Sequence, residues 1–234
     1  MVIMMDLQPF LPWQMYEVDY AFFLAMTLFP EVQQKAQREI DQVVGTDSLP
    51  VISDRENLPY IDAIVKEVLR WHPVAPMGLP HMTTEDDIYQ GYLIPKGALL
   101  MPNIWGFTHD PKSYHDPMVF KPERFLGPTP EPDPHTFAFG FGRCICPGRL
   151  LADSTLYLSI AKSLAVFNIT KPVDENGREV EPVVEFLPGV ISHPAPFKTR
   201  ITPRSPKHEE LIHSVEREHP WQKSDAETLE SIAY

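Results

Sequence analysis

Two cysteines, Cys144 and Cys146, lie in a loop of glycines and phenylalanines at residues 139–148. A disulfide between residues so close in sequence would close a very small, strained ring, so we expect a reduced or metal-bound state. Backbone N–H groups at the start of the helix expected after Pro147 favour a negatively charged thiolate, and a thiolate can ligate iron. The spacing favours such a ligand over the alternative, a small cysteine packed as an apolar side chain.

A second candidate group consists of Glu67 and Arg70. Apolar residues recur at helical spacing from Leu58 to His72, and Pro73 then ends the expected helix. Residues three apart share one helix face, so the carboxylate and the guanidinium can pair and join a third side chain. Taken alone, such a pair is more often a solvent-exposed salt bridge.

Together these motifs resemble the cytochrome P450 family of haem-thiolate monooxygenases. The family's cysteine loop reads Phe-x-x-Gly-x-Arg-x-Cys-x-Gly, and it matches this sequence at Phe139, Gly142, Cys146 and Gly148. The resemblance implies that Cys146 is the axial ligand of the iron in haem b, and that the loop binds the cofactor.

The sequence departs from the family at one position of this loop. The family's arginine, which reaches a haem propionate, is replaced by Cys144, and Arg143 stands one residue earlier. A thiol does not reproduce guanidinium geometry, so we expect weaker propionate neutralisation unless Arg143 substitutes. His81, after Pro80, resembles a second propionate-binding position, although an ordinary loop histidine is equally consistent.

The family's Glu-x-x-Arg helix matches Glu67 and Arg70, and residues 120–125 resemble the segment that supplies a third member, Arg124. The resemblance gives these three residues an architectural role. It also places five apolar residues in the substrate pocket: Val74, Met77, Leu79, Val190 and Ile191. Their character implies a lipophilic substrate.

The resemblance implies a mainly α fold with small antiparallel β-sheets, a truncated fold equivalent to the C-terminal half of the family fold. We expect an atypical segment at 1–21, the family portion at 22–203 and a polar, acidic, loosely packed tail at 204–234. A helix from Tyr20 to Val44 should break at Pro30. Strands are expected at 87–93 and 98–104, and at 183–186 paired with 197–201.

Two functions follow from this reading. In the first, the protein is a monooxygenase in which a substrate R–H, dioxygen and two electrons from an NADPH-dependent cytochrome P450 reductase give R–OH and water. The matched segments look most like fungal members, many of which act in secondary metabolism. In the second, the chain is a non-catalytic remnant without the distal half of the haem pocket.

Composition excludes other classes. Twenty Lys and Arg against 32 Asp and Glu give a net charge of −12, which disfavours nucleic-acid binding. No apolar run reaches the roughly 20 residues that a transmembrane helix needs. The family is generally anchored in the endoplasmic reticulum membrane, on its cytosolic face.

An unrelated hypothesis, a non-haem metal site, uses His109, Asp110, His115 and Asp116, although their spacing is more typical of Asp-Pro turns.

Overall fold

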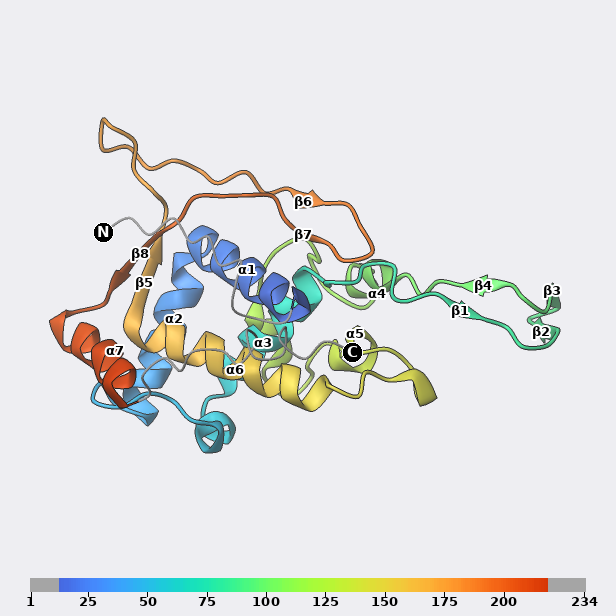
Figure 1. The fold of residues 1–234 in the computed structure, drawn as a ribbon, viewed down its shortest axis with the longest axis horizontal. Coiled ribbons are helices and arrows are strands. Elements are labelled where there is room, and N and C mark those ends of the chain that lie inside the picture. Colours follow the sequence, from blue (N-terminus) through green and yellow to red (C-terminus); the bar gives the residue numbers. More distant parts are fainter. Residues whose placement is uncertain (1–12, 219–234) are drawn as a thin grey trace, which may run out of the picture.

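Three helices, α1 (Trp13–Leu28), α3 (Pro59–Trp71) and α6 (Arg149–Val166), pack against one another at the centre of the molecule (Figure 1). The computed structural model describes residues 13–218. The other helical elements are α2 (Pro30–Val43), η1 (Ile52–Asn57), α4 (Ile104–Thr108), η2 (Pro122–Phe125), α5 (His135–Ala138), η3 (Gly142–Cys144) and α7 (Pro206–Glu218).

The strands are short: β1 (His81–Met82), β2 (Asp87–Tyr89), β3 (Tyr92–Ile94), β4 (Leu99–Leu100), β5 (Phe167–Thr170), β6 (Phe186–Leu187), β7 (His193–Pro194) and β8 (Arg200–Pro203). Within residues 13–218 they form four two-stranded antiparallel sheets, β1 with β4, β2 with β3, β5 with β8, and β6 with β7. The mainly α fold with small antiparallel sheets is confirmed.

The core is built from apolar faces of the three central helices. Residues 21–26 of α1 are buried on every side of the helix, as expected for a helix in the middle of a fold. On α3, the stripe that predicted the helix is buried, with Ile61, Ile64, Val65 and Val68 at 0% exposure. Tyr157, Ile160 and Leu164 of α6 complete the core, so burial of these faces fixes the helices that carry the candidate site.

The predicted break at Pro30 is confirmed. Pro30 occupies the first turn of α2, where its missing N–H costs no hydrogen bond. The helix ends before Gly45, which has φ of +87° and donates its N–H to the Ile40 carbonyl at 3.2 Å. A left-handed glycine after the last turn is a common helix stop.

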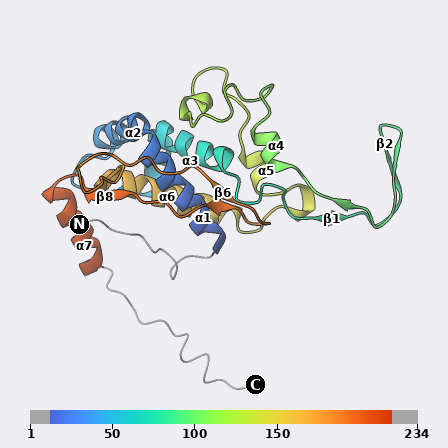
Figure 2. The same ribbon diagram turned by 90° about the horizontal axis from the view of Figure 1, so that it is seen from above.

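A β-arm, residues 77–101, projects from the body in both views (Figures 1 and 2). The predicted single strand at 87–93 is wrong, because the chain reverses at Gln90 and Gly91, whose φ values of 49° and 84° form a hairpin turn. The predicted strand at 98–104 is also too long. Asn103 caps α4 by accepting the Gly106 N–H at 2.9 Å, so Ile104 belongs to a helix.

The pairing of the last strands also differs from the prediction. Residues 183–186 do not pair with 197–201; instead β6 and β7 form a local hairpin, and β8 pairs with β5. Buried Ile169 and Ile201 face each other in the β5–β8 sheet. The Gln33 side chain holds this sheet, since it accepts the Ile169 N–H and donates to the Ile169 carbonyl, both at 2.8 Å.

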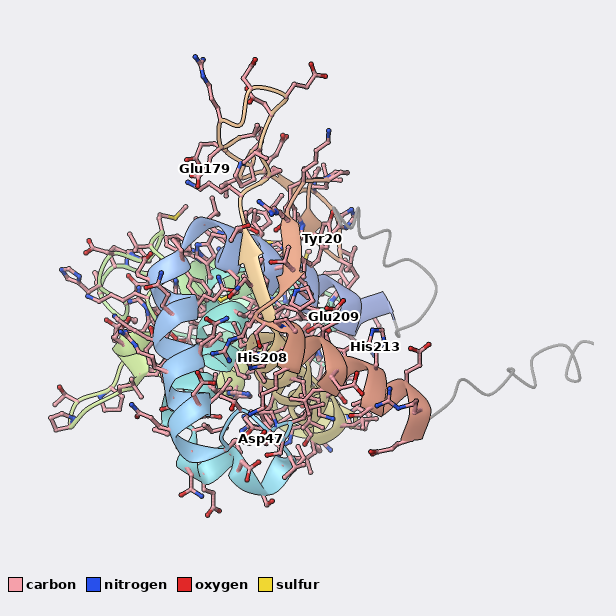
Figure 3. All side chains as sticks on the ribbon, turned by 90° about the vertical axis from the view of Figure 1, so that its left-hand side faces the viewer. Tyr20, Asp47, Glu179, His208, Glu209 and His213 are labelled. Carbon is pink, nitrogen blue, oxygen red and sulfur yellow. The ribbon has the colours of Figure 1, made fainter. Side chains whose placement is uncertain are left out.

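The polar tail expected at 204–234 begins as an ordered helix. Residues 206–218 form α7, which packs against α6, while residues 219–234 and 1–12 lie outside the described residues. His208 is buried against the body, whereas Glu209 and His213 are exposed (Figure 3). Among the helices of residues 13–218, none is both long enough and apolar enough to cross a bilayer.

Candidate functional site

Glu67 and Arg70 form a fully buried ion pair on α3. Both have 0% exposure, and two parallel hydrogen bonds join the guanidinium to the carboxylate at 2.7 and 2.9 Å. The remaining Arg70 donors bind the carbonyls of Thr108, Pro117 and Val119. This geometry differs from the exposed salt bridge that the spacing alone favours.

Arg124 of η2 joins the same carboxylate. Its Nε lies 3.2 Å from Glu67 Oε1, and the backbone N–H of Lys121 donates to that oxygen at 2.7 Å. Arg124 also pairs with Glu131 at 2.6 Å. One carboxylate thus ties α3 to the irregular segment between α4 and α5, which has little regular structure of its own.

The cysteine loop is folded back on itself between α5 and α6. The Cys146 N–H donates to the Phe139 carbonyl at 2.8 Å. Gly140 and Gly142 have φ of +86° and +55°, and a Cβ on Gly140 would lie 3.1 Å from the Cys144 carbonyl oxygen. Glycine is therefore favoured at position 140 by both conformation and space, and at position 142 by conformation alone.

The Cys146 thiol is partly exposed at the start of α6, and this argues against the packed apolar cysteine. A Cβ on Gly148 would lie 3.8 Å from Cys146 Sγ, so the glycine leaves room beside the sulfur. The helix N-terminus favours a thiolate. Leu150 and Leu151, in the first turn of α6, are more than 70% exposed. A thiolate donor, a glycine opening and nearby exposed apolar side chains fit a haem.

The two candidate propionate-binding residues come from different parts of the fold. His81 is partly buried on β1 of the β-arm, and Arg143 is exposed on η3. Within residues 13–218, neither side chain makes a hydrogen bond or an ion pair. The neighbouring Cys144 is exposed.

The two predicted pocket segments lie side by side. The Ser192 N–H, next to Ile191, donates to the Val74 carbonyl at 2.8 Å. His72 fixes the same junction: its ring stacks on Phe186 with centroids 4.0 Å apart, and its Nε2 lies 3.0 Å from the Ser192 carbonyl. Burial lowers the pKa of His72 to about 4, so this histidine is neutral.

Exposure divides the predicted pocket residues. Val74 and Ile191 are partly buried at the junction, while Met77, Leu79 and Val190 are 42%, 62% and 63% exposed. The structure thus groups the two segments and leaves most of their apolar surface open.

The alternative non-haem metal site is wrong. His109 is buried, stacks on Trp105, and directs Nδ1 to the Thr108 hydroxyl and the Trp105 carbonyl. His115 lies on the surface with its side chain 79% exposed, and its Nδ1 lies 2.9 Å from Asp116 Oδ2. In the described part of the chain, no three His, Cys, Asp or Glu side chains are placed to hold a metal ion.

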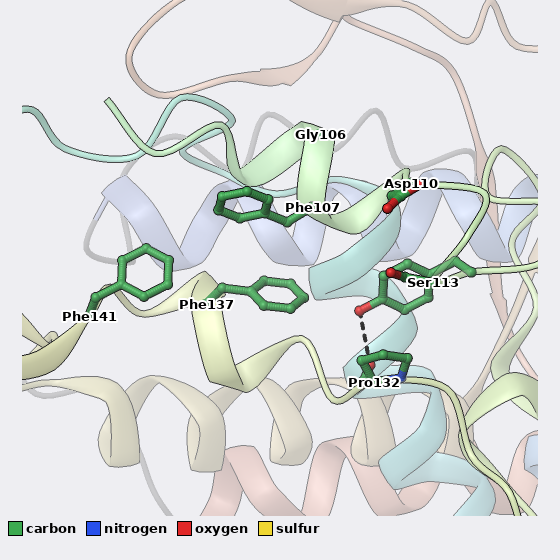
Figure 4. A pocket seen from close by; sticks show the side chains of 8 residues that line it. Gly106, Phe107, Asp110, Ser113, Pro132, Phe137 and Phe141 are labelled. Carbon is green, nitrogen blue, oxygen red and sulfur yellow. Dashed lines mark hydrogen bonds between the residues drawn. The ribbon is translucent and has the colours of Figure 1, made fainter. Parts of the chain in front are cut away.

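A hollow of about 290 Å³ lies beside the cysteine loop (Figure 4). Phe107, Phe137 and Phe141 supply aromatic walls, and the Tyr114 hydroxyl donates to the Pro132 carbonyl at 2.9 Å. Cys146 is not among its lining residues.

Two titratable groups outside the matched motifs lie on or beside the helices. Asp19, on α1, is 4% exposed, and burial raises its pKa to about 7 against a hydrogen bond from Ser159. His135 lies between two carboxylates at the entrance to the cysteine loop. An acid within an apolar helix and the Asp133-Pro134-His135 run were the available signals.

Comparisons with known proteins agree with this geometry. The family model described as Cytochrome P450 matches residues 18–201. Cytochrome P450 monooxygenase claR of Ampulloclitocybe clavipes is 61% identical over 212 residues, which cover 89% of this chain and 40% of that protein. O-methylsterigmatocystin oxidoreductase of Aspergillus flavus is 56% identical over 209 residues, or 88% and 39% of the two chains.

A solved structure extends the comparison to the fold. A zebra fish cytochrome P450 with abiraterone superposes with a TM-score of 0.73 at 33% identity, covering 81% of this chain and 44% of that one. The chain therefore spans about 40% of the length of the relatives it matches.

Proposed function

Since the chain belongs to the cytochrome P450 family, we propose that it provides the cysteine-ligand side of a haem-thiolate monooxygenase that oxidises a lipophilic small molecule. The observation that carries the proposal is the partly exposed Cys146 thiol, held by a glycine loop at the start of α6. Haem b bound through that thiolate supplies the oxygen-activating chemistry.

Each candidate residue has a defined task in this proposal. Cys146 binds the iron, and the N-terminus of α6 stabilises its negative charge. His81 and Arg143 orient the cofactor through its propionates, with Arg143 replacing the arginine missing at position 144. Phe139, Gly142 and Gly148 shape the loop, and Glu67, Arg70 and Arg124 hold its scaffold.

The substrate is lipophilic and of fungal secondary metabolism. In this proposal Val74, Met77, Leu79, Val190 and Ile191 offer the substrate apolar side chains, and Met77, Leu79 and Val190 are exposed. The fungal relatives include an oxidoreductase named for O-methylsterigmatocystin, and this name supports a small-molecule substrate.

The electrons come from an NADPH-dependent cytochrome P450 reductase, and the protein works at the cytosolic face of the endoplasmic reticulum membrane. Both assignments are supported by membership of the family. A net charge of −12 gives no support for a nucleic-acid partner.

The reduced carbon-monoxide difference spectrum of the purified chain, reconstituted with haem, tests the proposal. A thiolate-type Soret band is expected, because thiolate ligation gives haem this spectrum. Cys146→Ser should abolish the band, and the matched Cys144→Ser should leave it. The reverse pattern would mean that Cys144 is the ligand. No band from a folded chain would contradict haem binding by this chain and favour the non-catalytic remnant.

A further inference from the structure

His135 is placed between two carboxylates. Its Nδ1 lies 2.7 Å from Asp133 Oδ1, and its Nε2 lies 2.9 Å from Asp153 Oδ1 on α6. Both ring nitrogens can donate at once only when the imidazole is protonated. Burial alone would lower the pKa of His135, but the two carboxylates outweigh burial and raise it to about 9.

The two carboxylates belong to a closed ring of alternating charges. Asp153 accepts two hydrogen bonds from Arg55 at 2.6 and 2.9 Å, and Arg55 Nε donates to Asp62 at 2.8 Å. Lys66 closes the ring, since its Nζ lies 2.9 Å from Asp62 and 3.5 Å from Asp133. Three cations and three anions thereby connect η1, α3, α5 and α6.

The His135 side chain joins this ring of charges to the cysteine loop. The His135 ring stacks on Phe139, with centroids 5.8 Å apart and planes inclined by 20°. The Phe139 carbonyl in turn accepts the Cys146 N–H at 2.8 Å. The path from charge to ligand therefore runs from Asp153 through His135 and Phe139 to Cys146.

We propose that His135 is a positioning residue. Its ring packs on Phe139 and so fixes the loop backbone that places Cys146. The inference rests on the proposed function, because it assigns a role toward the proposed iron ligand. In this role His135 acts on the loop through its contact with Phe139. Its hydrogen bonds to two carboxylates fix the position of the ring that contacts Phe139.

Nuclear magnetic resonance titration of the haem-free chain tests this role. In the Cys144→Ser/Cys146→Ser background, no loop thiol titrates, while the residue 146 N–H still has the Phe139 carbonyl as partner. The amide resonance of residue 146 should shift with the same midpoint as the His135 ring, near pH 9. His115, which is exposed and paired with Asp116, is the control side chain for the variants below.

Two variants sharpen the test. His135→Gln should remove the shift at residue 146, and the matched His115→Gln should retain it. Asp153→Asn should lower the midpoint of His135 and of residue 146 together. Titration of the background chain needs neither variant, so a variant that does not fold leaves the test intact.

The outcomes separate the two proposals. If the amide of residue 146 does not shift with the His135 ring, or if the same shift persists after His135→Gln, the positioning role is wrong whatever the haem spectrum shows. If the amide follows His135 but Cys146 gives no thiolate-type band, the proposed function fails and the loop support stands.

Discussion

The Glu67 cluster and the cysteine loop differ in where their partners come from. Glu67 and Arg70, both fully buried, and Arg124 bind one another and nearby carbonyls, so their hydrogen bonds are satisfied within the chain. Around Cys146, by contrast, Arg143 and Cys144 are exposed, and so are the apolar side chains of Leu150 and Leu151. A satisfied cluster builds the scaffold, whereas an open group of donors and apolar side chains indicates a ligand.

The largest effect should come from breaking the satisfied cluster. Glu67→Gln leaves the buried Arg70 guanidinium without its counter-ion and removes one of the two carboxylates that Arg124 contacts, so the free energy of unfolding should fall by about 3–5 kcal/mol. Chemical denaturation measures this loss. The matched Glu210→Gln, whose pair with Arg217 is exposed, should cost less than about 1 kcal/mol. Equal effects would show that burial adds nothing.

Asp19 is an exception inside the well-satisfied body, because its buried Oδ1 has no hydrogen-bond partner within the described residues. With a pKa near 7 folded and near 4 unfolded, Asp19 keeps its proton only in the folded state between these values. Its contribution to stability is present below pH 4 and is lost as pH rises through 7, by roughly 3–4 kcal/mol.

Asp19→Asn should remove that part of the pH dependence. The unfolding free energy of the variant should exceed that of the natural chain at pH 8 and approach it at pH 4. Chemical denaturation of both proteins at pH 4 and pH 8 measures the difference in unfolding free energy between them. Groups that titrate alike in both proteins cancel in this difference. A difference that does not change with pH would show that Asp19 titrates normally.

Cys144→Arg tests the other half of the comparison, the proposal that the exposed side chains of the cysteine loop bind a ligand. A second guanidinium for the propionates should raise haem affinity by about tenfold, the equivalent of one charge-assisted hydrogen bond. Haem titration followed by absorbance measures it, with Cys144→Ser as the control. Unchanged affinity would indicate that Arg143 already fills this role.

The smallest effect is expected in the β-arm. Ile64→Val in α3 and Ile88→Val in β2 delete the same methylene, but Ile64 is fully buried and Ile88 is 71% exposed. The first change should cost about 0.5–1.5 kcal/mol and the second less than about 0.5 kcal/mol. Similar losses at both positions would mean that the arm is packed in solution.

Helices were predictable where nearby residues in the sequence carried a clear helix signal. The apolar stripe of α3 and Pro30 at the start of α2 needed no tertiary information. The strands did not have such signals. Turn chemistry at Gln90 and Gly91 split one expected strand, and the pairing of β8 with β5 depends on Gln33, 136 residues before Ile169.

The candidate site was predictable to the same extent. Spacing placed Glu67 and Arg70 on one face, but it did not indicate their burial, which depends on packing against η2 and neighbouring segments. Position in the sequence likewise did not reveal that His135 reaches Asp153, because α5 and α6 meet only in the folded chain. The sequence shows which side chains could pair, whereas the partners they have in the fold depend on how distant segments come together.

The two hydrogen bonds between the Gln33 side chain and the Ile169 backbone have a consequence for synthesis on the ribosome. Thr27 also bonds to Thr199 at 2.8 Å, and Asp41 binds Arg204. The first two helices thus obtain partners that are translated more than 130 residues later. Until those residues emerge, the nascent chain carries Phe22, Leu24 and Met26 without their final cover, and a chaperone has apolar helix to bind throughout that interval.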